Sequence, residues 1–392
     1  MGLRRRLAAA GGIVALLAPA AAEAAATSGN LRSESAAMAV DLASGKVLFS
    51  RNADLALEPA SNEKLMVTYG ALTELGPSYR FQTVVLGEGR QVGRVWQGRL
   101  VLRGSGDPTL ETADLQRLVK KLYSLGIRTV TGQVAGDASW FDRRWTAPGW
   151  LADDYGIESA PLSALVVNRA FRDGRLVRDP ALAAAALFDQ LLRARGIDAR
   201  GAVVGRAAAN ATGLASVRSH KLSLLLREMN TDSDNFTAEM VLKAIGAERA
   251  GDGSTATGAA IVRRDLAAAG VPLEGARIVD GSGLSRLDRV TARELTSLLV
   301  LFWKTPSLRT IVTSSLAIAG ETGTLKDRLL GKKTLGIVHG KTGTTQISSA
   351  LSGYVGSRYA FVLIENGHPV DSDAAHKLQD RFVGALAAQK PL

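Results

Sequence analysis

Residues 59–77 read PASNEKLMVTYGALTELGP, and this stretch sets the organisation of the chain. Its apolar positions recur at the spacing of a helix with one buried face, and a glycine followed by a proline stops the pattern. The positions on that face are Leu65, Thr68, Leu72 and Leu75. We therefore expect the first long helix of the protein to begin at about Ser61.

Ser61 and Lys64 form the only S-x-x-K sequence in the chain. Residues three apart project from one face of a helix, so the hydroxyl and the amine are expected to touch. A serine hydroxyl is a weak nucleophile until a base removes its proton. Lysine can act as that base only if its pKa falls well below about 10.4, which burial and a second cation would cause.

Two further motifs follow in order, Ser233-Asp234-Asn235 and Lys341-Thr342-Gly343. K-T-G is unique in the chain, whereas S-x-N also occurs at 28–30 and 50–52, so only its position between the other motifs favours Ser233. Lys341 is the candidate second cation, and Ser233 is expected to relay a proton. The three motifs match the S-x-x-K, S-D-N and K-T-G set of penicillin-binding proteins and serine β-lactamases.

The K-T-G motif is expected to lie on a strand that binds an extended peptide. Gly343 lacks a side chain, which lets another backbone approach, and an edge strand there could take up a peptide by strand addition. Lys341 and Thr342 would supply a charge and a hydroxyl for a carboxylate. The N–H groups of Ser61 and Thr344 would stabilise an oxyanion, at about 3 to 4 kcal/mol for one donor.

Each motif also has a simpler explanation when taken alone. Ser61 could cap its helix, residues 233–235 could cap the next one, and residues 341–343 could form a solvated strand end. The three motifs together, in this order and on these elements, favour a catalytic site.

The composition excludes several classes of protein. The chain has 392 residues, of which 46% are hydrophobic and 22% charged, and this composition is typical of a folded protein of two or three domains. It has no cysteine, so disulfides, thiol nucleophiles and cysteine-ligated metals are excluded. The net charge of +11 suggests an anionic partner, but with 5% aromatic residues and scattered arginines we expect no nucleic-acid binding. A polyanionic cell envelope fits the charge equally well.

The N-terminus is typical of a secretory signal peptide, which we expect to span residues 1–26. Three arginines at 4–6 precede an apolar run at 7–19, and small residues with A-x-A spacing follow. An uncleaved anchor is the alternative. The apolar run is short for a membrane span, so we expect an exported, periplasmic or extracellular protein that is at most peripheral to the membrane.

The rest of the pattern predicts an α+β fold, in which an antiparallel sheet is flanked by helices and a smaller α/β domain is inserted. Residues 36–49 alternate as a hairpin, and the region from 81 to 141 changes to short strands around one helix at 114–125. Further helices are expected at 182–194, 220–229, 235–247, 263–269, 292–303 and 373–388, and strands at 335–338, 350–355 and 359–364.

Other function classes find less support in the sequence. Residues 336–342 approach a phosphate-binding loop, but residue 335 is leucine where the pattern needs glycine, and the following residues favour a strand over a helix. The four histidines lack the H-E-x-x-H spacing of metal hydrolases, so metal-dependent hydrolysis finds no support in the residues. No G-x-S-x-G elbow occurs. A non-catalytic wall-binding protein and a nucleotide-binding protein remain the alternatives from other classes.

Beyond the motifs, the sequence resembles the D-alanyl-D-alanine carboxypeptidase/endopeptidases known as class C low-molecular-mass penicillin-binding proteins, peptidase family S13. The resemblance covers nearly the whole mature chain. It extends to the segments GSGDPTL at 104–110, SAPLSALVVN at 159–168, DGSGLS at 280–285 and the stretch 339–354.

The resemblance implies a penicillin-recognising transpeptidase-like catalytic domain, at 27–80 and 205–392, with an inserted domain at 81–204. It implies cleavage of D-Ala-D-Ala bonds in peptidoglycan stem peptides, with D-Ala-containing crosslinks as a second substrate and β-lactam antibiotics as covalent inhibitors. The roles it implies are nucleophile for Ser61, base for Lys64, proton relay for Ser233 and substrate binding for Asn235, Lys341, Thr342, Gly343 and Thr344.

Two features depart from the family pattern. Only residues 169–179 stand where many members carry a further β-rich domain, so the inserted domain is expected to be shortened. Thr322 stands before Gly323 where relatives commonly have aspartate. A serine β-lactamase is the nearest chemical alternative, although the E-x-x-L-N segment of one class of those enzymes is absent.

Overall fold

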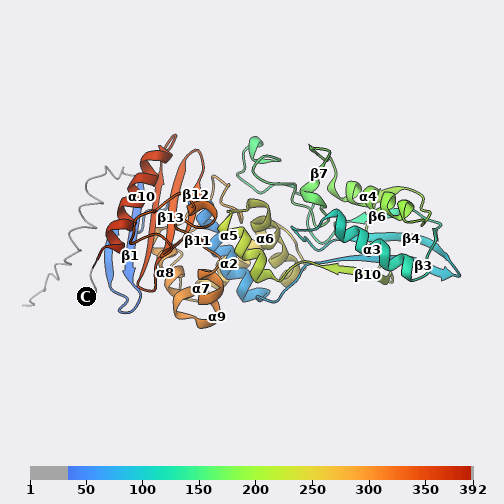
Figure 1. Cartoon of the computed structure of the whole chain (residues 1–392), viewed down its shortest axis with the longest axis horizontal. Helices are drawn as coiled ribbons and strands as arrows, with labels where there is room; N and C mark the ends of the chain where they lie inside the picture. Colours follow the sequence, from blue (N-terminus) through green and yellow to red (C-terminus); the bar gives the residue numbers. More distant parts are fainter. Residues whose placement is uncertain (1–33, 390–392) are drawn as a thin grey trace, which may run out of the picture.

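The computed structural model describes residues 34–389 and has two units side by side along its long axis (Figure 1). The larger unit is built on a six-stranded antiparallel sheet in the order β11-β12-β13-β14-β1-β2. Its strands are β1 (Ser35–Asp41), β2 (Val47–Arg51), β11 (Ala317–Ile318), β12 (Val338–Thr344), β13 (Ser348–Val355) and β14 (Tyr359–Asn366). The α+β class expected from the sequence is confirmed.

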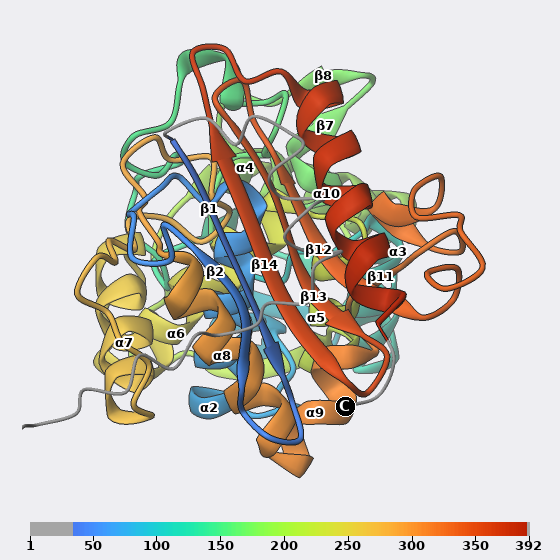
Figure 2. The ribbon, with the colours of Figure 1, turned by 90° about the vertical axis from the view of Figure 1, so that its left-hand side faces the viewer.

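The sheet is buried on both faces, so successive residues of its central strands enter different cores. On β14, Phe361 and Leu363 face the C-terminal helix α10 (Ser372–Ala387), which lies across the sheet in Figure 2. Val362 and Ile364 face the opposite layer of helices. A helical layer thus covers one face, and a single helix covers the other.

The helical layer contains the S-x-x-K sequence of Ser61 and Lys64. A 3-10 turn, η1 (Ala60–Glu63), leads directly into α2 (Lys64–Glu74). Around α2 lie α5 (Leu222–Thr231), α6 (Asn235–Ala250), α7 (Thr255–Ala268), α8 (Ala292–Lys304) and α9 (Pro306–Thr313). Residues 236–247 of α6 are all buried, which makes α6 the centre of this layer.

The smaller unit has a mixed sheet in the order β10-β3-β4-β6-β9, with β5 paired to β4. Its strands are β3 (Gln82–Val92), β4 (Val95–Arg103), β5 (Thr129–Val130), β6 (Val134–Asp137), β9 (Ala202–Val204) and β10 (Thr212–Arg218). The helices α3 (Thr112–Ser124) and α4 (Pro180–Ala194) pack on it, and β7 (Phe171–Arg172) and β8 (Arg175–Leu176) form a short separate hairpin.

The limit of the inserted unit differs from the sequence-based expectation of 81–204. Strand β10 lies beyond residue 204, yet it pairs with β3 through Gln82↔Arg218 and the residues that follow. We therefore propose 82–218 as the inserted unit. The β-rich domain expected to be missing is represented between residues 169 and 179 only by the β7–β8 hairpin.

Most predicted elements of the larger unit are confirmed, but the helix expected at 263–269 is α7 and begins at Thr255, and strand β11 was not expected. The strand expected at 335–338 is wrong, because residues 334–337 form turns and β12 begins only at Val338. Helix α9 was not expected, although Pro306 stands at its first position, where a proline is favourable.

No helix between residues 34 and 389 has the length and hydropathy of a membrane span. The signal peptide expected at 1–26 lies outside the described residues.

We predict that Phe382→Ala destabilises the larger unit by about 3 to 5 kcal/mol, because it leaves a cavity between α10 and the sheet. Phe382 is 1% exposed and meets the ring of Phe49 edge-on at a centroid distance of 5.2 Å. Urea unfolding followed by circular dichroism measures the loss. Phe171→Ala, which removes a ring that is 42% exposed, is the control and should change stability by less than about 1 kcal/mol. Equal losses in the two variants would contradict this account of the core.

Candidate active site

Ser61 and Lys64 meet at the junction of η1 and α2. The Nζ atom of Lys64 donates to Ser61 Oγ at 2.8 Å, to Asn235 Oδ1 at 2.7 Å and to the carbonyl oxygen of Ser282 at 2.6 Å. Ser61 lies within the turn and makes no capping hydrogen bond, so the simpler explanation of a helix cap does not hold for it. The serine and lysine of S-x-x-K are in contact, as the spacing predicted.

The environment of Lys64 makes its amine easier to deprotonate than that of a lysine in water. Its side chain is fully buried, and this burial lowers its pKa to about 8. Carboxylates act in the opposite direction, Asp280 first and then Asp234 and Glu239. Burial is thus the larger effect on the pKa of Lys64.

Ser233 and Lys341 form a second contact of the same kind. Lys341 Nζ donates to Ser233 Oγ at 2.9 Å and to the carbonyl oxygen of Thr342 at 2.8 Å. Burial lowers the pKa of Lys341 well below its usual value, and the positive charge of Lys64 adds to this effect. The two lysines therefore interact electrostatically, although the sequence suggested that Lys341 would lower the pKa of Lys64.

The turn between α5 and α6 holds Ser233 and Asn235. Ser233 has a φ of +62°, which is uncommon for a residue with a side chain, and the cap of α6 is Asp234, whose carboxylate accepts from the N–H of Thr237. Arg169 of the inserted unit forms an ion pair with that carboxylate. The motif is therefore held by a residue that the sequence did not point to.

Strand β12 approaches η1 closely at Gly343. A Cβ atom added there would lie 2.9 Å from the backbone nitrogen of Ser61. The room that glycine leaves is thus taken up by η1 of the same chain, whereas the sequence analysis assigned it to a ligand. Strand β11 pairs only with His339 and Gly340, so within residues 34–389 the outer edge of β12 from Lys341 to Thr344 has no partner strand.

A cavity of about 340 Å³ opens at this place. Of the predicted site residues, it is lined by Ser61, Ser233, Asn235, Thr342 and Thr344. Lys64 and Lys341 lie fully buried behind the hydroxyls that they contact. Three segments distant in sequence, 61–64, 233–235 and 341–344, therefore bring all eight predicted residues to one place.

Other residues of the cavity were not identified from the sequence. They are Glu158, Asp232, Gly283, Leu284, Thr324, Arg328, Thr345 and His376. Thr324, in η4 (Gly323–Leu325), accepts a hydrogen bond from the hydroxyl of Thr342 at 2.7 Å. These residues come from six separate places in the chain and form no motif, so only the fold brings them together.

The loop at 280–285 holds the carbonyl group that accepts from Lys64. Glu239 Oε1 accepts from the N–H groups of Gly281 and Ser282, both at 2.8 Å. Asp280 accepts from the N–H groups of Gly283 and Ser285 and from the indole N–H of Trp150. The role of this segment could not be predicted from the sequence. The structure shows that it holds the carbonyl oxygen of Ser282 in place for the amine of Lys64.

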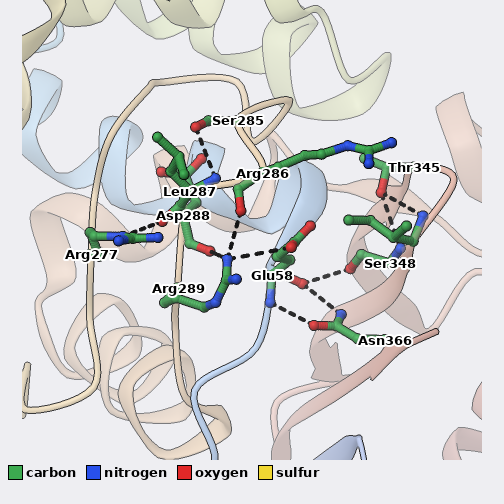
Figure 3. Close-up of polar contacts among 11 residues, drawn as sticks. Glu58, Arg277, Ser285, Arg286, Leu287, Asp288, Arg289, Thr345, Ser348 and Asn366 are labelled. Carbon is green, nitrogen blue, oxygen red and sulfur yellow. Dashed lines mark hydrogen bonds and ion pairs between the residues drawn. The ribbon is translucent and has the colours of Figure 1, made fainter. Parts of the chain in front are cut away.

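Figure 3 shows how the chain just before η1 is fixed to the sheet. The carbonyl oxygen of Glu58 accepts from Ser348 Oγ at 2.6 Å and Asn366 Nδ2 at 3.1 Å, and its N–H donates to Asn366 Oδ1 at 2.8 Å. Arg289 forms an ion pair with the Glu58 carboxylate at 3.4 Å. These contacts hold the turn of Ser61 against β13 and β14.

Comparison with protein families gives a match over nearly the whole chain. The model described as the D-Ala-D-Ala carboxypeptidase 3 (S13) family matches residues 18–173 and 169–389. The two parts meet at 169–173, where the chain has the short β7–β8 hairpin.

Curated relatives agree with this match. A D-alanyl-D-alanine carboxypeptidase of Actinomadura is 32% identical over 90% of this chain and 81% of its own length. A carboxypeptidase of Mycobacterium tuberculosis is 33% identical over 82% of this chain and 73% of its own.

Among solved structures, penicillin binding protein 4 of Haemophilus influenzae has a TM-score of 0.85 at 21% identity, covering 94% of this chain and 99% of its own. A second structure of that protein, in complex with a β-lactam, has a TM-score of 0.79. These structures share the fold of this chain.

We predict that Gly283→Ala disturbs the support of Lys64. Gly283 has a φ of +81°, and an added Cβ would lie 1.9 Å from the carbonyl oxygen of Ala60. Gly270→Ala is a matched control, because its φ is +78° and an added Cβ meets nothing within 4 Å. The control should lose about 1 to 2 kcal/mol from backbone strain alone, and Gly283→Ala clearly more. Urea unfolding compares the two, and equal losses would show that the contact with Ala60 does not matter.

Proposed function

This chain belongs to the D-Ala-D-Ala carboxypeptidase 3 (S13) family, and on that premise we propose that it hydrolyses the D-Ala-D-Ala bond of peptidoglycan stem peptides through an acyl-enzyme on Ser61. The observation that carries the proposal is the 2.8 Å contact between Ser61 Oγ and a buried Lys64 whose pKa is lowered to about 8. A pKa near the working pH is the condition that general base catalysis requires.

Acylation begins when neutral Lys64 takes the proton of Ser61 as Oγ attacks the carbonyl carbon of the penultimate D-alanine. The oxyanion of the tetrahedral intermediate accepts hydrogen bonds from the N–H groups of Ser61 and Thr344. The C–N bond then breaks, the leaving amine takes up a proton through Ser233, and D-alanine departs. Ser233 suits this step because its Oγ lies in the cavity and contacts Lys341 Nζ at 2.9 Å.

Hydrolysis of the ester completes the cycle. Lys64, neutral again after its proton has passed to the leaving group, takes a proton from water as the water oxygen attacks the acyl carbon. Ser61 regains its proton when the ester C–O bond breaks. The proposed steps need no metal ion and no organic cofactor.

The terminal carboxylate of the substrate is bound at β12. The hydroxyls of Thr342 and Thr344 line the cavity, and a carboxylate held there would favour the protonated, cationic form of Lys341 behind them. Asn235, with Oδ1 on Lys64 and Nδ2 on the carbonyl oxygen of Glu158, lies where it can hydrogen-bond the peptide on the other side.

The unpaired edge of β12 provides room for the rest of the stem peptide. The peptide adds to Lys341–Thr344 as a further strand. A second cavity of about 200 Å³ continues past Gly283, Thr344 and Thr345, and residues 151–158 of the inserted unit form its far side. Crosslinked peptides that end in the same D-Ala bond are substrates of the same site, so we include endopeptidase activity in the proposal.

The place of action follows from the substrate. Peptidoglycan lies outside the cytoplasmic membrane, and we propose that the chain is exported to the periplasm or cell wall through the signal sequence expected at 1–26. β-Lactams mimic the D-Ala-D-Ala bond, and a solved structure of similar fold carries one, so we propose that they acylate Ser61.

We predict that Ser61→Ala abolishes covalent labelling by a fluorescent penicillin, because the hydroxyl oxygen forms the ester. Mass spectrometry of the intact protein and of its peptides should place the adduct of the wild type on the peptide containing Ser61. Ser44→Ala, a change in the exposed turn between β1 and β2, is the control and should label normally. An adduct on Ser61→Ala at the wild-type rate would refute the assignment.

The acylation rate should rise with pH. Only the neutral amine of Lys64 accepts a proton, and with a pKa of about 8 its neutral fraction grows about tenfold per pH unit below that value and levels off above it. Stopped-flow acylation between pH 6 and 9 measures this profile. Lys64→Ala should lower the plateau by about 10²- to 10⁴-fold and remove the rise. A flat profile in the wild type would exclude Lys64 as the base.

A further inference from the structure

A long groove lies on the inserted unit, apart from the catalytic cavity. It consists of two adjoining cavities of about 390 and 510 Å³, which share Asp137, Ser139 and Arg206. The smaller cavity is bordered by β6 and by the start of α4, and the larger one extends to the C-terminal end of α6. The two cavities together offer consecutive subsites for an elongated ligand.

Two tryptophans line this groove from one loop. Trp140 borders the larger cavity and is 38% exposed, and Trp145 borders the smaller one and is partly exposed. Neither belongs to a hydrophobic core cluster, and neither indole N–H has a hydrogen-bond partner within residues 34–389. Exposed aromatic rings in adjacent concave sites are suited to binding a ligand with flat apolar faces.

The loop that carries the tryptophans is firmly anchored. The carboxylate of Asp137 is buried and accepts from the N–H groups of Ser139 and Ala207, both at 2.9 Å, which joins the two walls of the groove. Asp142 forms an ion pair with Lys243 on α6, and its N–H donates to the carbonyl oxygen of Gly253. The rings are therefore presented by a fixed backbone, which lowers the entropic cost of binding.

Arginine side chains supply hydrogen-bond donors around the rings. Arg206 lies where the two cavities meet, Arg103 lines the larger one and Arg143 the smaller one. None of their guanidinium groups makes an ion pair or hydrogen bond with the part of the chain that the structure describes. Each guanidinium offers five N–H donors, which fit hydroxyl and amide oxygens as well as anions.

We propose that this groove binds the glycan of peptidoglycan, a chain of β-1,4-linked N-acetylated amino sugars. The proposal rests on the proposed function, which makes a saccharide-linked peptide the substrate. Pyranose rings have apolar C–H faces that pack on Trp140 and Trp145, while their acetamido and hydroxyl oxygens accept from Arg103, Arg143 and Arg206. Two subsites with one tryptophan each match a disaccharide unit.

The position of the groove agrees with the length of a stem peptide. Asn235 at the start of α6 lies in the catalytic cavity, and Lys243, which holds Asp142 of the smaller cavity, follows eight residues later, about 12 Å along the helix. Ala247 of the larger cavity lies about 18 Å along the helix, so the smaller cavity is the one within reach of the stem's first sugar. A stem of about four residues before the scissile bond spans up to about 14 Å when extended. Residues 151–158 border the second cavity next to the catalytic one, and Trp145 precedes them in the same segment.

The test uses binding and hydrolysis separately. Binding of N-acetylchitotetraose is measured by isothermal titration calorimetry, which needs no tryptophan signal, in the wild type, in Trp140→Ala/Trp145→Ala and in Phe171→Ala. Phe171 is the matched control, an aromatic residue of the inserted unit that is 42% exposed outside the groove. We expect saturable binding to the wild type and the control, and at least a tenfold loss of affinity in the double variant. A melting curve and penicillin labelling confirm that each variant is folded, and Arg206→Gln provides a milder variant of the same groove.

Hydrolysis then relates the groove to the substrate. The wild type should show a KM about tenfold lower for a disaccharide-linked pentapeptide than for the free pentapeptide, and the double variant should lose that ratio while Phe171→Ala keeps it. No hydrolysis of either peptide by the wild type would overturn the proposed function. The binding of chitotetraose would still show whether the groove binds the glycan.

Three results would overturn the glycan assignment. The first is equal chitotetraose binding by the wild type and the double variant. The second is the absence of chitotetraose binding by the wild type. The third is binding of an anionic wall polymer, probed with polyphosphate, that weakens with salt and is independent of the tryptophans, since it would assign the groove to anions.

Discussion

An amine held out of water is the constraint on which the rest of the site depends. Lys64 is fully buried, yet its Nζ atom has three acceptors, namely Ser61 Oγ, Asn235 Oδ1 and the carbonyl oxygen of Ser282. Burial favours the neutral amine, and the acceptors favour the ammonium ion. The pKa of Lys64 therefore depends on how far these two effects offset each other. Such a balance holds only if every acceptor stays in place.

The surrounding structure keeps these acceptors in place. Glu239 and Asp280, both buried, bind the backbone of the loop that carries Ser282, and the inserted unit reaches across through Arg169 to the cap of α6. Glu63 lies in the same region with no hydrogen-bond partner for its carboxylate among the described residues, and burial raises its pKa well above the usual value. A neutral Glu63 adds no charge that would favour the protonated form of Lys64.

The sequence predicted which residues meet at the site better than it predicted their surroundings. S-x-x-K and K-T-G are short local patterns, and the contact of Ser61 with Lys64 follows from helix geometry alone. The α+β class and most helices followed from apolar periodicity. Thr324, Arg328 and His376 could not be found, because they enter the cavity from segments joined only by the fold. The proposed extension of the inserted unit beyond residue 204 could not be found either, because β10 lies far along the chain from β3, its partner.

The pairing of the first strand with the last one has a consequence for how the protein matures. Met38 of β1 lies opposite Val362 of β14, and the turn of Ser61 is fixed to Ser348 and Asn366. Contacts between such distant parts of a chain form late, because a long loop must close first. The inserted unit, with its own core, is able to fold as soon as its strands are synthesised. Ser61 therefore reaches its place in the folded site only after the C-terminal strands have emerged, so a partly made chain lacks the assembled cavity.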